Sequence, residues 1–299
     1  MTDLDEISVF ASCRLCDSQE TTKLYTSKRY FFNVAKCQDC GLVSVQNPPS
    51  ENTLREMYSE ENSFIQFSNA MKNNKVHLRH ERFLLEIKAF LDGKLTSQIQ
   101  LFDIGAGSGD FLNEARNAGF FVFGNEFSTA AVRYAWAQYE IILDTHPLEE
   151  DWRDSYFDVI TMWGLLEHVR DPLDVLTQAA RLLKPGGVMY IYTPVWCFYD
   201  TFGLLLAKFT NVSRLLDRRI SNAHLQLFPK TTLEWAINQV GLQVLKFDQV
   251  CEYNLPVVAY LESLGVPDWL INFLAWVLDL LIERNLFFRN NSRIFCRKN

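Results

Sequence analysis

The sequence is poor in glycine and proline, has no excess of positive charge, and lacks a long uninterrupted apolar run. Its 299 residues include 13 glycines and 9 prolines, which excludes a collagen-like chain and argues against a disordered one. The 29 lysines and arginines are outnumbered by 36 aspartates and glutamates, and the net charge of −7 has the wrong sign for binding phosphate backbones. We therefore expect a globular protein of one large or two ordinary domains that does not bind nucleic acid.

Neither a secretion signal nor a membrane-spanning segment is recognisable. Residues 1–10 carry three acidic residues and no basic or apolar stretch, so the sequence predicts a cytoplasmic location. The most apolar window, residues 269–282, is interrupted by two polar residues and is shorter than the roughly 20 residues that span a bilayer. This window is therefore not expected to cross a membrane unaided.

Four of the seven cysteines form two pairs near the amino terminus. Cys13 and Cys16 make one C-x-x-C pair and Cys37 and Cys40 make another, which is the spacing of a zinc site. Four thiolates leave no open coordination position, so this zinc should be structural. We therefore expect a zinc ribbon over residues 8–50. The alternatives are a disulfide pair or four unrelated buried thiols.

The middle of the chain carries a strand, a glycine loop and a helix in succession. A helical connector is predicted over residues 51–97, before this motif. Gly105, Gly107 and Gly109 then separate an apolar β-run from a helical pattern, with an acid on each side of the loop. A dinucleotide fingerprint would need a glycine at the next position after the third one, and the flanking acids would repel a pyrophosphate. The loop therefore favours a ligand that carries positive charge.

Acidic residues mark both ends of this predicted ligand site. Asp103 and Asp110 flank the glycines, and Glu126 ends the next predicted strand, residues 121–126. In a parallel sheet this last position places a carboxylate for two ribose hydroxyls. A nucleoside with a cationic tail fits both ends. The alternative is a β-turn-α connection that binds no ligand.

Further motifs follow at residues 156–172, 180–192 and 224–230. Together with residues 103–126, and in this order, they resemble the class I S-adenosylmethionine-dependent methyltransferases. The resemblance implies an α/β fold over residues 98–299: a Rossmann-like, seven-stranded, mostly parallel sheet with a reversed last strand. The cysteine pairs resemble the zinc-ribbon leader of a subset of these enzymes, which includes sugar C-methyltransferases.

The resemblance also implies roles for individual residues. The aspartate and glycines of the loop would shape the pocket for the methionine part of the cofactor, and the glutamate would hold its ribose. Phe127 and Leu148 would lie against the two faces of the adenine, and Trp163 would line the methionine side or pack in the core. The predicted cofactor-binding residues are Asp103, Gly105, Gly107, Gly109, Glu126, Phe127, Leu148 and Trp163.

Three side chains are candidates for the catalytic group. Methyl transfer from a sulfonium mainly requires alignment of the reactants, but a hydroxyl or acidic carbon acceptor also needs a base, commonly a histidine. His168 follows a predicted strand and His224 precedes a predicted helix, so both can approach the carboxyl end of the sheet. Tyr199 could offer its phenol to the acceptor. The alternatives are a structural cap for His168 and plain packing for Tyr199.

Two apolar insertions interrupt the domain, at about residues 195–222 and 255–290. The first is predicted to form apolar helical structure that covers the substrate. In the second, the polar residues of a predicted helix fall on one narrow stripe and leave a wide apolar arc. This arc can pack on the enzyme or on a twin subunit of a homodimer, or it can meet a membrane surface through residues 255–288.

The sequence thus predicts an enzyme that transfers a methyl group from S-adenosylmethionine to a small-molecule or lipid-linked acceptor. A sugar, a quinone precursor or a polyprenyl-linked glycan would serve as this acceptor. S-adenosylmethionine and a structural zinc ion are the expected cofactors, and the expected location is the cytoplasm, with or without peripheral contact with a membrane. The competing classes are a non-catalytic S-adenosylmethionine-binding protein and an NAD or nucleotide-sugar oxidoreductase, which the acid-flanked loop disfavours.

Overall fold

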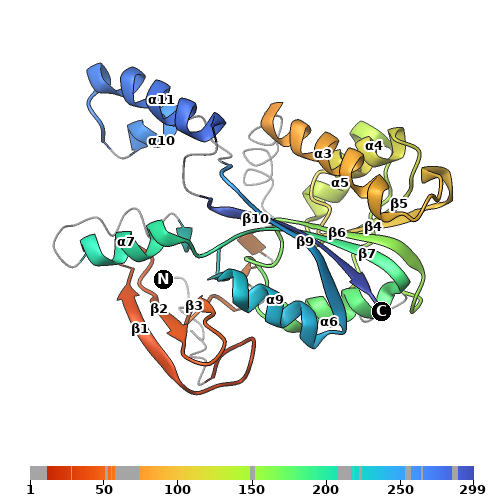
Figure 1. The fold of residues 1–299 in the computed structure, drawn as a ribbon, viewed down its shortest axis with the longest axis horizontal. Helices are drawn as coiled ribbons and strands as arrows, with labels where there is room; N and C mark the ends of the chain where they lie inside the picture. The colour runs from red at the N-terminus through yellow and green to blue at the C-terminus, as the bar shows by residue number, and fades with distance from the viewer. Residues whose placement is uncertain are drawn as a thin grey trace. The chain divides into compact units, whose positions relative to one another are not determined.

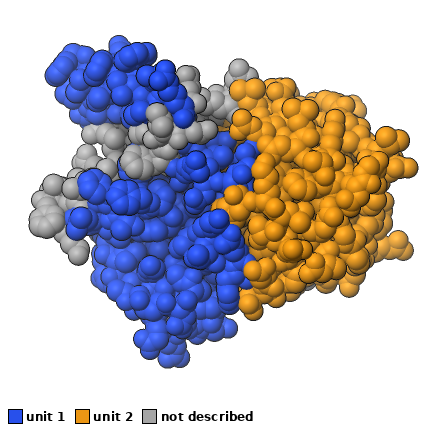
Figure 2. Space-filling model, viewed as in Figure 1, with its two compact units in different colours: residues 1–50, 193–235, 248–293 blue, residues 51–192, 236–247, 294–299 orange. Residues whose placement is uncertain are grey.

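The structure is a computed structural model of the whole chain, in which two compact units are distinguished (Figure 2). The described residues are 12–27, 29–50, 53–54, 56–57, 74–148, 152–207, 217, 219–221, 224–252, 257–263, 265–284 and 289–299. Unit 1 comprises residues 1–50, 193–235 and 248–293, and unit 2 comprises residues 51–192, 236–247 and 294–299. These units are discontinuous in sequence, whereas the predicted domains follow chain order.

Parts of four predicted segments lie outside the described residues. They are the beginning of the zinc ribbon, most of the first half of the connector, and portions of both apolar insertions. The domain boundaries at residues 8–50, 51–97 and 98–299 stay a prediction.

The larger sheet has six strands in the order β5-β4-β6-β7-β10-β9 (Figure 1). Its strands are β4 Gln100–Ile104, β5 Phe121–Asn125, β6 Phe157–Trp163, β7 Leu183–Pro194, β9 Leu242–Val250 and β10 Asn291–Lys298. β4 pairs in parallel with β5 and β6, and β6 pairs in parallel with β7. The residues of β4 and β6 are nearly all buried, as expected for strands covered on both faces.

The last strand runs against its neighbour, as predicted. The Ser292 hydroxyl donates to the Thr193 carbonyl at 3.2 Å, and the Cys296 thiol lies 3.5 Å from the Met189 carbonyl. Advancing along β10 therefore means going backwards along β7, which is the antiparallel arrangement. The predicted α/β class with a reversed last strand is confirmed.

The strand count differs from the prediction. The described residues contain six strands in this sheet, and the position expected for a seventh is held by Asp144, which forms a single parallel bridge with Asn125. The Asp144 amide donates to the Gly124 carbonyl at 3.0 Å, and the Glu126 amide donates to the Asp144 carbonyl at 2.8 Å. Pairing stops there because the Asp144 carboxylate accepts the His146 amide at 2.7 Å, which turns the chain away from the sheet.

Helices cover both faces of this sheet: α3, α4 and α5 lie on one face and α6 on the other (Figure 1). Their bounds are α3 Asn74–Glu86, α4 Asp110–Asn117, α5 Thr129–Tyr139 and α6 Pro172–Leu182. Further helices among the described residues are α7 Phe198–Ala207, α9 Lys230–Gln239, α10 Val257–Ser263 and α11 Asp268–Glu283, with 3-10 turns at Ile87–Phe90 and Thr96–Gln98. α6 begins where capping rules predict, because the Asp171 carboxylate accepts the Asp174 amide and Pro172 occupies the first turn.

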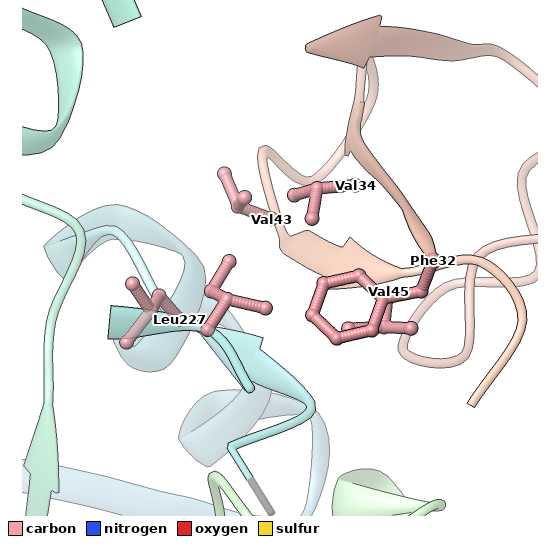
Figure 3. Packing of buried hydrophobic residues seen from close by; sticks show 6 residues of the cluster. Phe32, Val34, Val43, Val45 and Leu227 are labelled. Atoms are coloured by element: carbon pink, nitrogen blue, oxygen red, sulfur yellow. The ribbon is translucent and has the colours of Figure 1, made fainter. Parts of the chain in front are cut away.

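Unit 1 contains a second, four-stranded sheet in the order β1-β2-β3-β8. Its strands are β1 Thr21–Thr26, β2 Asn33–Cys37, β3 Val43–Val45 and β8 Gln226–Leu227. Figure 3 shows the side chains of Phe32, Val34, Val43, Val45 and Leu227 directed toward one another. Residues far apart in the chain thus share one small apolar core.

Among the helices within the described residues, none combines the length and the apolar character that a membrane crossing requires.

Candidate functional site

The glycine loop between β4 and α4 adopts a conformation that other residues rarely reach. Gly105, Gly107 and Gly109 have φ angles of +69°, +54° and +76°. A Cβ atom on Gly105 would lie 2.9 Å from Leu165 Cδ1, and one on Gly109 would lie 3.0 Å from Ala135 Cβ. Glycine is therefore required both by the backbone and by the space.

Glu126 is held against this loop by backbone hydrogen bonds. The Gly107 amide donates to Glu126 Oε2 at 2.9 Å, and the Ser128 amide donates to Oε1 at 2.8 Å. Each carboxylate oxygen can accept a second hydrogen bond, so the group keeps capacity for a ligand. Burial raises the pKa of Glu126.

Asp103, at the end of β4, is the most deeply buried acid of the site. It is 2% exposed, and the Thr161 hydroxyl donates to its Oδ1 at 2.6 Å. Burial raises the pKa of Asp103 to about 8, and the neighbouring charge of Glu126 adds to the rise. A positively charged ligand would favour the ionised carboxylate, so the chemistry of Asp103 suits a cation.

Asp110, at the start of α4, is hydrogen-bonded within the protein. Its carboxylate accepts hydrogen bonds from the hydroxyls of Ser108 and Tyr139. The bond from Tyr139 ties the start of α4 to the end of α5. The suitability of Asp110 for a positively charged ligand stays a prediction.

Trp163, at the carboxyl end of β6, lies in a cluster of aromatic rings. Its ring centroid is 4.8 Å from that of His80, 5.0 Å from that of Phe111 and 4.8 Å from that of Tyr190. Within the described part of the chain, its indole N–H is buried and has no hydrogen-bond partner. Core packing therefore accounts for the position of the Trp163 ring. Because its buried N–H lacks a partner among the described residues, a contact between this group and the cofactor stays a prediction.

Helix α3 brings residues to the site that the sequence motifs did not predict. The Arg79 guanidinium lies 5.2 Å from the centre of the Tyr192 ring, at the carboxyl end of β7. The sequence did indicate which face of this helix packs inward, because Val76, His80 and Phe83 recur at helical spacing and form one stripe. All three of these side chains are buried, so this face of α3 packs inward and brings Arg79 to the strand ends.

Phe127 and Leu148 are placed differently from each other. Phe127 follows Glu126 and is 43% exposed, whereas Leu148 is buried. The Leu148 carbonyl accepts a hydrogen bond from Arg181 at 2.7 Å. Their contacts with an adenine stay predictions.

The candidate catalytic residues belong to both units. His168 lies in unit 2 beside the buried Glu167, with 3.8 Å between His168 Nε2 and Glu167 Oε1. Tyr199 and His224 belong to unit 1. Burial lowers the pKa of His224, which favours its neutral form. The catalytic roles of all three stay predictions.

The four amino-terminal cysteines of unit 1 converge on one point. Cys13 Sγ and Cys40 Sγ lie 3.6 Å apart, as do Cys16 Sγ and Cys37 Sγ, and all four sulfurs lie within 4.8 Å of one another. Tetrahedral zinc with bonds of about 2.3 Å separates its sulfurs by roughly 3.8 Å, whereas a disulfide joins them at about 2.0 Å. The donor set therefore fits a zinc ion, and none of these cysteines is in a disulfide.

Backbone turns prepare the cluster for a metal. The Asp17 amide donates to the Cys13 carbonyl at 2.8 Å, and the Gly41 amide donates to the Cys37 carbonyl at 3.2 Å. Gly41 has a φ of +81°, which suits glycine in such a turn. The contact with Cys40 lowers the pKa of Cys13, which favours the thiolate form that a metal binds.

Comparison with known proteins identifies the family of this chain. A family model described as a methyltransferase domain matches residues 76–246, more than half of the chain. A ubiquinone biosynthesis O-methyltransferase of Thiobacillus denitrificans is 30% identical over 129 residues, which cover 39% of this chain and 48% of the relative. The chain thus spans about half the length of that relative.

Solved structures share the fold at low identity. A phosphoethanolamine N-methyltransferase of Haemonchus contortus superposes with a TM-score of 0.57 at 14% identity, covering 86% of this chain and 61% of that one. The magnesium protoporphyrin IX methyltransferase of Synechocystis PCC 6803 gives a TM-score of 0.56 at 12% identity, covering 84% and 100%. These likenesses concern the fold alone.

Proposed function

The chain belongs to the methyltransferase domain family, and from this premise we propose that it binds S-adenosylmethionine in unit 2 and methylates a small-molecule or lipid-linked acceptor. The observation that carries the proposal is the 2.9 Å hydrogen bond from the Gly107 amide to Glu126. This bond fixes a carboxylate beside the glycine loop, whose backbone carries no side chains at its glycine positions. A ribose and a cationic tail can then be recognised at adjacent points.

The proposed binding roles follow from the chemistry of each side chain. Glu126 accepts hydrogen bonds from the ribose hydroxyls, and the buried Asp103 favours the positively charged methionine part. Arg79 offers its guanidinium to the carboxylate of that part. Phe127 and Leu148 flank the adenine, and the orphaned N–H of Trp163 donates to a polar atom of the ligand.

Proton removal from the acceptor is the chemical task left to the protein. Bound S-adenosylmethionine supplies an activated methyl group, because its sulfonium leaves as a neutral thioether. His168 Nε2 accepts the proton of an acceptor hydroxyl as the oxygen–carbon bond forms and the sulfur–carbon bond breaks. Glu167, 3.8 Å away, then stabilises the imidazolium. Tyr199 and His224 remain further candidates for contact with the acceptor.

The acceptor class is proposed from the relatives. Their name, ubiquinone biosynthesis O-methyltransferase, favours a hydroxyl of a quinone precursor over a sugar or a polyprenyl-linked glycan. A hydroxyl acceptor agrees with a histidine base, since a base with a pKa of about 6.5 works at neutral pH.

The cysteine cluster of unit 1 is proposed to hold one structural zinc ion. Cys13, Cys16, Cys37 and Cys40 supply four thiolates, which fill a tetrahedral shell and leave no position for a substrate. The ion would then hold the turns of the ribbon together without taking part in methyl transfer.

Calorimetry with S-adenosylhomocysteine and with NAD separates the proposed function from its alternatives. We expect S-adenosylhomocysteine to bind and NAD not to bind, since NAD would bring its pyrophosphate to an acidic loop. Binding of NAD in its place would overturn the proposal in favour of an oxidoreductase.

Turnover is measured next with a methyl-labelled cofactor. The acceptor panel contains quinol precursors, nucleotide sugars and polyprenyl-linked sugars, and the proposal expects label on the quinol precursors. Tight binding of S-adenosylhomocysteine without labelling of any acceptor would instead identify a non-catalytic binding protein.

A further inference from the structure

Helix α11 has an apolar face that its own hairpin partner does not cover. α10 and α11 form a helical hairpin in unit 1 (Figure 1). Ile271 and Ala275 of α11 are buried with Val257 and Leu261 of α10. The hairpin is therefore closed by its own small core, and residues on the rest of α11 are free to serve another purpose.

The uncovered side of α11 carries its largest aromatic side chains. Trp269 is 81% exposed, Phe273 is 59% exposed and Trp276 is 63% exposed. Their spacing of four and three residues puts them on one stripe of the helix. Exposed polar residues flank this stripe, among them Asp268 and Asn272.

Helix α7, in the same unit, repeats this pattern. Phe198 is 70% exposed, Phe202 is 44% exposed and Leu205 is 53% exposed, and they stand at the same spacing of four and three residues. Two separate helices of unit 1 therefore present apolar ridges to solvent, where burial of aromatic area would be favourable.

We infer that the apolar ridges of α7 and α11 each dock on a membrane composed of zwitterionic lipid. A fluid lipid surface accepts separate ridges without matching grooves, whereas a protein partner must supply one groove for each ridge. Tryptophan and phenylalanine are the side chains that settle at the level of the headgroups. α11 has 16 residues, fewer than the roughly 20 that span a bilayer, so it would lie in the interface.

Charge selects the type of lipid. The polar stripe beside the aromatic residues of α11 carries Asp268 and Asp279, and the chain as a whole has a net charge of −7. Anionic headgroups would be repelled, while the cationic group of a zwitterionic headgroup complements these carboxylates. The inference does not rest on the proposed methyl transfer, because it concerns a different surface and a different ligand.

Flotation with lipid vesicles tests the inference. The full-length protein is expected to float with phosphatidylcholine vesicles, and adding phosphatidylglycerol to them is expected to leave binding unchanged or weaker. The Trp269→Ala/Trp276→Ala variant should bind roughly tenfold less or worse, because two large apolar side chains no longer enter the lipid. Phe198→Ala/Phe202→Ala should lower binding as well.

Two controls keep the result specific. Trp136→Ala removes a tryptophan of α5 in unit 2 that is 56% exposed, and it should leave flotation unchanged. Trp269→Phe/Trp276→Phe keeps aromatic area on the ridge and should float, which covers the case in which the alanine variant fails to fold.

Four outcomes would overturn the inference. They are no flotation of the unmodified protein, flotation that requires phosphatidylglycerol, flotation of the alanine variant equal to the unmodified protein, or self-association in sedimentation that the alanine variant abolishes in the absence of vesicle binding. Binding of S-adenosylhomocysteine is measured on the same preparations, so failure of the surface and failure of the proposed function are distinguished.

Discussion

The cysteine cluster of unit 1 and the glycine loop of unit 2 are both suited to a cation, but they are held in shape by different means. The sulfurs of Cys13 and Cys40 lie 3.6 Å apart on two turns that backbone hydrogen bonds close, and between the two sulfurs there is only a thiol contact. The carboxylate of Glu126 is fixed by two backbone amides, at 2.9 and 2.8 Å. We therefore expect the first site to need an ion to remain assembled, whereas the second is assembled without its ligand.

This difference follows from what surrounds each site. The small sheet of unit 1 packs around a few apolar side chains, such as Val34 and Val45, and small apolar cores commonly depend on a metal or a disulfide. The glycine loop extends from β4 and α4 of a large sheet with buried strands. Ligand removal should therefore unfold part of unit 1 and leave unit 2 folded.

The largest effect is expected from removing two of the four thiols. The variant Cys13→Ser/Cys37→Ser should lose its metal and several kcal/mol of the stability of unit 1, since metal binding is coupled to folding in such modules. Atomic absorption measures the metal, and thermal unfolding measures the stability. Binding of S-adenosylhomocysteine should persist, because its proposed site lies in unit 2.

A matched control is Cys251→Ser, which alters another buried cysteine of unit 1 and should keep the metal. Stoichiometric zinc in the double variant would contradict the four-thiolate site. Loss of both metal and cofactor binding would instead show that the ribbon is integral to the fold of the second unit, and the contrast between the two sites would disappear.

The next largest effect concerns Glu126. The variant Glu126→Ala should weaken binding of S-adenosylhomocysteine by about 1 to 3 kcal/mol, roughly 5- to 150-fold, because the ribose hydroxyls lose their acceptor. Calorimetry measures the affinity. An unchanged affinity would remove Glu126 from the site.

The same variant also frees the Gly107 and Ser128 amides, so a second ligand separates the two causes. The 2′-deoxy analogue of S-adenosylhomocysteine lacks one ribose hydroxyl. If Glu126 pairs with the ribose, this analogue should bind the unmodified protein more weakly but lose little further affinity in the variant. Equal losses for both ligands would point to a distorted loop instead.

Local patterns predicted the framework of unit 2 well. The β-run before the glycines, the helix after them and the strand ending near Glu126 appear as β4, α4 and β5, because each depends on short-range periodicity and on glycine. The reversed last strand was also predicted. The two C-x-x-C pairs predicted a cluster for the same reason, since spacing alone brings each pair together.

Features set by tertiary contacts could not be predicted in this way. The hydrogen bond from Tyr139 to the Asp110 carboxylate joins residues that are distant in the chain, so no local spacing indicates it. Arg79 reaches the strand ends only because α3 packs inward through Val76 and Phe83. The wide apolar arc of α11 is divided between contact with α10 and solvent, a division that sequence periodicity does not specify.

A smaller effect is expected from pH, through Asp103. Its pKa of about 8 lies above the ordinary 3.8, so the folded, ligand-free protein holds a proton that the unfolded chain releases, and stability falls as pH rises between these values. S-adenosylmethionine favours the ionised form, so its affinity should increase about fivefold from pH 7 to pH 8 as the ionised fraction rises, and should level off at higher pH. The affinity of S-adenosylhomocysteine, which lacks the sulfonium charge, should change less.

The variant Asp103→Asn tests the origin of this pH dependence. An amide keeps the shape of the side chain but does not titrate, so the affinity for S-adenosylmethionine should become nearly independent of pH in this range. A persistent rise in affinity across the same pH values would assign the titration to another group and would weaken the view that unit 2 holds its cation by a buried carboxylate.

The smallest effect is expected from Arg79, which would extend the preassembled site to the other end of the cofactor. The variant Arg79→Ala should weaken binding of S-adenosylhomocysteine by about 1 kcal/mol, roughly fivefold, because a partly exposed ion pair contributes little more. An analogue that lacks the methionine carboxylate should bind both proteins equally. Arg82→Ala, on the exposed side of the same helix, controls for the loss of positive charge and should bind normally. If the two variants weaken binding alike, Arg79 acts through the general field of α3 and makes no direct contact with the carboxylate.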